Sequence, residues 1–94
     1  MRIEALVWFG EIVEKLEGKH NVQPYEVEEV FVNHPLFRFV EKGYRAEENV
    51  YAAMGQTDVG RSLVVFFVCK KDKKALVLTA RDMTNKERKK DEQE

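Results

Sequence analysis

An uninterrupted apolar run at residues 63–69 (LVVFFVC) constrains the fold of this chain more than any other feature. The run is far shorter than the roughly 20 residues needed to cross a bilayer, so it predicts no membrane span. A strand with one face in water alternates apolar and polar residues, whereas a strand buried on both faces is continuously apolar. We therefore expect residues 61–69 to form a central strand covered on both sides, and one cover could come from another chain.

Four further segments favour strands, and the turns between the last three strands are short. Residues 57–60 are typical of a hairpin connection, and residues 70–74 turn the chain back after the central strand. Strands in such close succession predict a meander, in which neighbours run antiparallel. The other predicted strands are residues 3–8, 36–40, 49–56 and 75–81.

Two helices are predicted before the meander. Apolar residues recur on one face of residues 11–16, and Gly18 suits the C-terminal end of that helix. Pro24 suits the first position of a second helix, because the N–H that proline lacks would have no partner there. This second helix is expected to reach about residue 32 and to stop at the Asn33-His34-Pro35 segment.

A third, short helix is predicted at the C-terminus. Thr84 and Glu87 have the spacing of a capping box, which opens a helix from residue 85 to about residue 91. The residues of this helix are almost all polar, so it has no apolar face to dock. We therefore expect residues 89–94 to fray.

These elements predict an α+β fold in one domain over residues 1–94. Two N-terminal helices pack on a mainly antiparallel sheet of four or five strands, and a short helix follows. The 94 residues are 44% hydrophobic, which is enough for one small core. The single cysteine excludes an internal disulfide, and the acidic residues near the start do not fit a signal peptide. A cytoplasmic location is the simplest expectation.

The charge is unevenly distributed along the chain. The net charge of −1 divides into −5 for residues 1–60 and +4 for residues 61–94. The basic end could face an anion such as nucleic acid, or it could be a solvated helix surface rich in lysine. Cationic or cationisable side chains fall at predicted strand ends and helix junctions. They are Lys19, His20, Arg61, Arg81 and Arg88.

Arg61 and Arg81 are expected near the same end of the sheet, because they begin and end two strands joined by a tight turn. Two neighbouring guanidinium groups repel unless an anion lies between them, and arginine binds phosphate with two hydrogen bonds. Alternatively, each arginine pairs with a carboxylate, for which Asp58, Asp82 and Glu87 are candidates.

Metal-free RNA cleavage needs a base, an acid and cations for the developing negative charge. Histidine side chains can take up or release a proton near neutral pH, so His20 could serve as base or acid, and Lys19 could contribute charge. Alternatively, His20 caps the end of its helix, and Glu87 serves only the capping box. The sequence has no phosphate-binding glycine loop, zinc-protease motif, cysteine cluster or esterase motif, so no metal or other cofactor is expected.

Three segments together resemble the BrnT family of bacterial toxins. They are KHNVQPYEVEEVF at residues 19–31, GQTDVGRSLVVFF at residues 55–67 and LVLTARDMTNKERKK at residues 76–90. The resemblance implies a RelE-like fold and an endoribonuclease that arrests translation and is neutralised by a cognate antitoxin. It also implies that the antitoxin is of the ribbon-helix-helix type, that it alone contacts DNA, and that a homodimer or a heterotetramer with antitoxin forms. The family's site residues correspond to Lys19, His20, Arg61, Arg81, Glu87 and Arg88.

The chain departs from the family pattern at three positions. Asn21 replaces a glycine, and Gln23 replaces a serine or threonine. Asp91 stands where a tyrosine is common, which places a negative charge near the expected RNA site. An alternative function is therefore a catalytically weak or inactive relative that binds the antitoxin in operon autoregulation, with the acidic helix at residues 26–29 as part of that surface. Those glutamates could equally form a solvated helix face.

Overall fold

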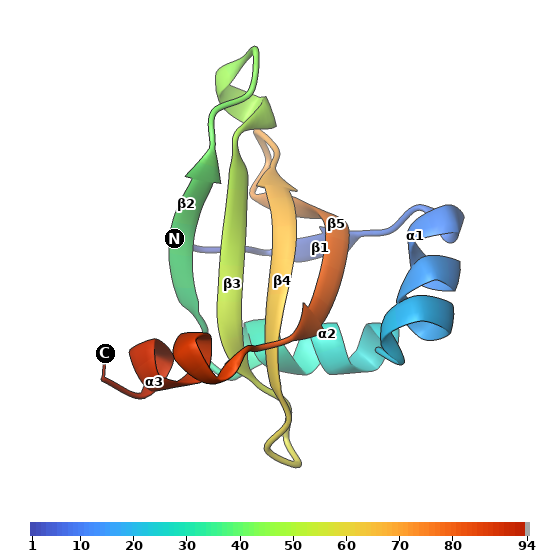
Figure 1. Cartoon of the computed structure of the whole chain (residues 1–94). Coiled ribbons are helices and arrows are strands. Elements are labelled where there is room, and N and C mark those ends of the chain that lie inside the picture. Colours follow the sequence, from blue (N-terminus) through green and yellow to red (C-terminus); the bar gives the residue numbers. More distant parts are fainter. Residues whose placement is uncertain (94) are drawn as a thin grey trace.

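The structure is a computed structural model that describes residues 1–93, and the side chains of all of these except Ala46 and residues 90–93. A five-stranded sheet has the order β1-β5-β4-β3-β2 (Figure 1). The strands are β1 (Ala5–Val7), β2 (Leu36–Glu41), β3 (Val50–Gln56), β4 (Ser62–Cys69) and β5 (Lys74–Asp82). The helices are α1 (Gly10–Lys15), η1 (Leu16–His20), α2 (Pro24–Val32), η2 (Ala46–Glu48) and α3 (Asn85–Gln93).

Strand β4 lies at the centre of the sheet, as its unbroken apolar sequence predicts. It pairs antiparallel with β3 and β5, and β2 pairs antiparallel with β3. Only β1 is parallel to its neighbour, β5, and it is much shorter than the predicted residues 3–8. The expected α+β class and the mainly antiparallel meander are confirmed.

Helix α1 does not end at Gly18. Instead the chain continues from α1 into η1, a π-helical turn that includes Gly18, Lys19 and His20. The helix ends at Asn21, whose φ of 52° and ψ of 41° are left-handed. Asparagine adopts this conformation at lower cost than most residues, so Asn21 can take the left-handed position at the helix end that glycine usually occupies.

The core fills both faces of β4. On one face, α2 packs against side chains centred on Phe67, which is fully buried. On the other face, Val64 and Met54 form a smaller cluster with Met83, just before α3. Figure 1 shows α2 behind the sheet and α3 in front of it, at the end that holds the β3–β4 turn. The candidate residues gather at this end.

The C-terminal helix forms where predicted and extends to Gln93. The backbone N–H of Glu87 donates to Thr84 Oγ1 at 3.2 Å, and that of Thr84 donates to Glu87 Oε1 at 2.8 Å, so the predicted capping box is present. The backbone of α3 is helical to Gln93, and the fraying expected for residues 89–94 stays a prediction. Residue 94 and the side chain of Asp91 lie outside the described part of the chain. Within residues 1–93, no helix has the length and apolar character required to span a membrane.

Candidate functional site

The β3–β4 turn places Arg61 immediately before the central strand. The backbone N–H of Thr57 donates to the Arg61 carbonyl at 2.9 Å, and the backbone N–H of Arg61 donates to Thr57 Oγ1 at 3.1 Å. Gly60 has a φ of 91°, which favours glycine. The turn therefore fixes the direction in which the Arg61 side chain leaves the backbone.

The Arg61 side chain joins three parts of the chain. Its Nε and Nη2 donate to the two carboxylate oxygens of Asp82 on β5, at 2.8 and 3.1 Å. Its Nη1 donates to Glu26 on α2, at 3.2 Å from each oxygen. The backbone carbonyls of Asn21 and His20, at the end of η1, accept from Nη1 at 2.7 Å and from Nη2 at 3.2 Å.

These contacts stabilise the charged forms of the groups involved. The hydrogen bond from Arg61 holds the pKa of the Asp82 carboxyl below its usual range, and attraction to Arg61 and to His20 acts in the same direction. The same pair raises the pKa of Arg61. The backbone carbonyl of His20 accepts from the same Arg61 Nη2 that donates to Asp82.

Arg81 forms a second pair, with Glu87 at the start of α3. Its Nη1 and Nη2 donate to the two Glu87 oxygens at 2.8 and 3.0 Å. The guanidinium carbon lies 5.6 Å from the centroid of the Phe66 ring, within range of a cation–π interaction. The hydrogen bonds from Arg81 and from the Thr84 backbone lower the pKa of Glu87 to about 2.

The two arginines lie at the same end of the sheet but on opposite faces. Arg81 and Asp82 are consecutive on β5, so their side chains point to opposite faces. Arg61 contacts Asp82 on the α2 face, whereas Arg81 contacts Glu87 on the α3 face. The expectation that the two guanidinium groups stand side by side around one anion is wrong, and the alternative of carboxylate pairing is confirmed with Asp82 and Glu87. Asp58 instead accepts from Asn33.

A pocket of about 340 Å³ opens at the edge between these faces. Its lining includes Arg61, Asp82 and Arg88, with Gly60, Ser62 and Met83 completing the wall. Among the described side chains, neither Arg88 nor Lys19 is in an ion pair. Lys19 is exposed and lies next to His20 in η1, a π-helical turn of a kind often found at functional sites. The structure thus brings Arg61 and Arg88 to one pocket and holds the backbone carbonyl of His20 on Arg61. It also joins Arg81 and Glu87 at the base of the helix that carries Arg88.

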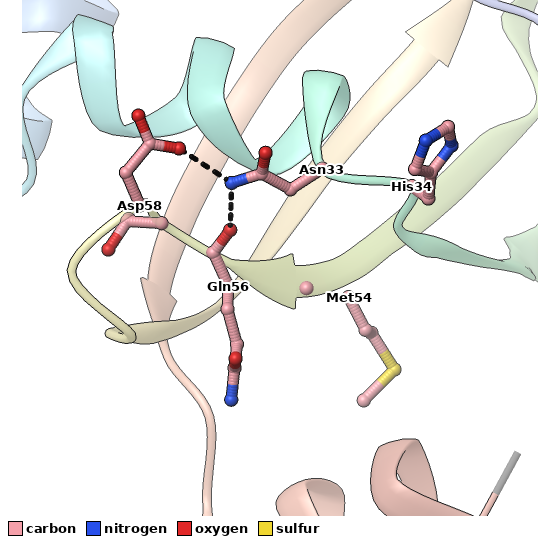
Figure 2. A pocket seen from close by; sticks show the side chains of 7 residues that line it. Asn33, His34, Met54, Gln56 and Asp58 are labelled. Carbon is pink, nitrogen blue, oxygen red and sulfur yellow. Dashed lines mark hydrogen bonds between the residues drawn. The ribbon is translucent and has the colours of Figure 1, made fainter.

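A larger pocket, of about 510 Å³, lies at the other end of α2 and contains none of the predicted site residues. Figure 2 shows Asn33 Nδ2 joined to Asp58 and to the Gln56 carbonyl, with His34 set apart from them. The described residues contain no group of three or more His, Cys, Asp or Glu side chains that could hold a metal ion. Pocket size alone therefore does not locate the candidate site.

Glu26 is the residue of the site that the sequence reasoning missed. It was expected on a solvated helix face, yet it is only 8% exposed and binds Arg61. The signal was present in the spacing of Gln23 and Glu26, which form a capping box in which the Gln23 backbone N–H donates to Glu26 Oε1 at 3.0 Å. A carboxylate in that position is turned toward the helix start rather than toward solvent.

The Glu87 pair predicts a pH-dependent loss of stability. Because the folded-state pKa of about 2 lies below the unfolded value near 4.5, the stabilisation is complete above pH 4.5 and is lost as the pH falls toward 2. Partial exposure limits it to about 1 kcal/mol. Urea unfolding of wild type and Glu87→Gln should differ by this amount at pH 7 and converge near pH 2, with the exposed Glu28→Gln as control. A difference that does not change with pH would contradict the pairing.

Comparison with known proteins supports one family. The model of the family described as "Ribonuclease toxin, BrnT, of type II toxin-antitoxin system" matches residues 13–87. The crystal structure of the ribonuclease toxin BrnT of Brucella abortus superposes with a TM-score of 0.61 at 14% identity, covering 86% of this chain and 97% of the other, which shows the shared fold. A search of curated proteins found no match. The family match spans most of the chain and includes both carboxylate-paired arginines, so the chain belongs to the BrnT family of ribonuclease toxins of type II toxin-antitoxin systems.

Proposed function

We propose that this protein cleaves single-stranded RNA without a metal ion, arrests translation in the cytoplasm, and is neutralised by a cognate antitoxin. The observation that carries the proposal is the pocket lined by Arg61 and Arg88, where Arg88 has no described ion pair and Arg61 binds the backbone carbonyl of His20. A histidine supplies proton transfer near neutral pH, and unpaired cations attract the RNA backbone. The RelE-like character of the fold is part of this proposal.

Each candidate residue has a separate role in the proposed cleavage reaction. His20 takes the proton of the ribose 2′-hydroxyl or returns a proton to the departing 5′-oxygen, while the 2′-oxygen bonds to phosphorus and the 5′-oxygen bond breaks. Lys19 and Arg88 stabilise the negative charge that develops on the phosphorane oxygens. Arg81 and Glu87 hold the first turn of α3 and so orient Arg88, the next residue in the helix. A water or a second side chain completes the proton transfer opposite His20.

Cleavage of a defined single-stranded RNA by the purified protein tests the proposal. Because the proposed reacting groups are all side chains of the protein, cleavage should proceed at an unchanged rate in the presence of excess EDTA. The products should end in a 2′,3′-cyclic phosphate, which mass spectrometry of the fragments detects. Cleavage that appears only after a divalent cation is added would contradict the proposal.

The proposed antitoxin is a ribbon-helix-helix protein, and DNA is contacted only through it. A type II toxin acts in a pair with a protein antitoxin, so a protein partner follows from the family. We propose that the toxin forms either a homodimer or a heterotetramer with the antitoxin. Sedimentation of the toxin alone and of the co-expressed complex distinguishes the two.

A second candidate function is an antitoxin-binding module with little or no catalysis. The observation that favours it is the pairing of Arg61 and Arg81 with carboxylates, which removes two of the predicted cations from contact with RNA. The RNA assay decides between the two functions. A wild-type protein that binds its antitoxin tightly but leaves RNA intact would support the function of an antitoxin-binding module.

A further inference from the structure

The Arg61 guanidinium has no N–H left for a substrate. An arginine carries five N–H donors. Nε donates to Asp82, Nη1 donates to Asn21 and Glu26, and Nη2 donates to His20 and Asp82, so each donor has an acceptor inside the protein. We infer that Arg61 is a positioning residue that holds the η1 turn, and with it His20, against the sheet, instead of binding RNA phosphate. This inference rests on the proposed function.

The first reason concerns the end of the helix. The last carbonyls of a helix have no partner within it and must find other donors. Arg61 donates to the carbonyls of His20 and Asn21, directly at the point where the chain enters the left-handed conformation. The guanidinium therefore caps the turn that carries the proposed base, although Arg61 lies 40 residues from Asn21 in sequence.

The second reason concerns the cost of releasing Arg61 to a phosphate. Glu26 is almost fully buried, so removing its partner would leave a carboxylate charge with little access to water. Asp82 is more exposed, yet it holds the same guanidinium through two oxygens in the bidentate geometry that arginine uses for phosphate. The place that an RNA phosphate would take on Arg61 is thus already occupied by Asp82.

Arg88 provides the internal comparison. It lines the same pocket as Arg61, is exposed, and has no ion pair among the described side chains. The two arginines therefore have different roles at this pocket. Arg88 is available to RNA, whereas Arg61 and its two carboxylates, Glu26 and Asp82, fix the position of the catalytic turn.

The salt dependence of RNA binding separates a phosphate contact from a positioning role. The probe is a single-stranded 2′-O-methyl RNA, which binds but lacks the attacking hydroxyl. Each phosphate contact to a single strand contributes about 0.7 to the slope of log K against log salt. Because Arg61→Gln alone would leave Glu26 buried without a partner, the comparison is between E26Q and E26Q/R61Q. We expect equal slopes for these two, and a slope smaller by about 0.7 for R88Q than for wild type.

The second measurement follows His20 directly. The chain has two histidines, so its imidazole Cε1–H resonances are two, and H34Q assigns them. We expect R61K, which keeps the charge but cannot make all five hydrogen bonds, to shift or broaden the His20 signal and leave His34 unchanged. The same variant should lower kcat at least tenfold, with KM within twofold of wild type. The kcat of D82N should lie between those of R61K and wild type.

The outcomes distinguish this inference from the proposed function. A slope that falls by about 0.7 from E26Q to E26Q/R61Q, or an unperturbed His20 signal in R61K, overturns the positioning role. A wild type that neither binds nor cleaves RNA overturns the proposed function, while the His20 signal still tests whether Arg61 holds the turn. Thermal unfolding of each variant shows whether it is folded at the assay temperature. If the single Arg61 variant is unfolded, the double variant E26Q/R61Q is measured in its place.

Discussion

Replacing His20 with alanine is expected to slow RNA cleavage about 10²–10⁴-fold, the range that one proton-transfer group contributes. The effect should appear in the cleavage step and leave RNA affinity nearly unchanged, because the cations proposed to attract RNA are Lys19 and Arg88. Single-turnover rates on a defined RNA at saturating enzyme measure this step. The imidazole is removed without loss of the Arg61 hydrogen bond, since Arg61 binds the backbone carbonyl of His20.

His34→Ala is the matched control for this prediction. His34 is an exposed histidine in a left-handed turn and lines pockets away from Arg61, Asp82 and Arg88. Its replacement should leave the cleavage rate within twofold of wild type. Equal losses in both variants, or full activity in His20→Ala, would remove His20 from the reaction.

The central strand and the C-terminal cap could be predicted because each depends on neighbouring residues. Seven apolar residues in succession do not fit a half-exposed strand, and this alone places β4 inside the sheet. The Thr84 and Glu87 capping box is likewise a local pattern, and both of its hydrogen bonds form.

The arrangement of the site could be predicted only in part. The hairpin correctly places Arg61 and Arg81 at one end of the sheet, but it does not say which face each side chain occupies. Arg61 precedes β4, so the alternation of strand side chains does not determine its direction. Its partners Glu26 and Asp82 lie 35 and 21 residues away, and only tertiary packing decides that they meet.

The end of the first helix shows a different limit. Gly18 is a plausible C-terminal residue, yet the helix widens into a π-helical turn and ends three residues later at Asn21. The Arg61 guanidinium donates to the last carbonyls of this longer helix, so the end of the helix is set by a residue from another part of the chain. The local pattern of residues 11–20 contains no sign of that partner.

Replacing Phe67 with alanine is expected to lower the free energy of unfolding by about 3–5 kcal/mol. The side chain is 0% exposed, and its ring centroid lies 5.3 Å from that of Phe31, 5.9 Å from that of Phe37 and 6.0 Å from that of Tyr51. A small domain has only about 5–15 kcal/mol in total, so the variant should be close to the limit of folding. Urea unfolding followed by circular dichroism measures the change.

Phe66→Ala is the matched control, because Phe66 is the neighbouring phenylalanine on the opposite face of β4 and is only partly buried. Its loss should cost clearly less than that of Phe67, and equal costs would contradict the asymmetry of the two faces. The Phe67 variant also separates stability from chemistry. Phe67 pairs with Tyr51 and Val77, away from the end of β4 that follows Arg61. Cleavage per folded molecule should therefore stay near wild type while the folded fraction falls. His20→Ala should show the reverse, with a stable fold and slow cleavage.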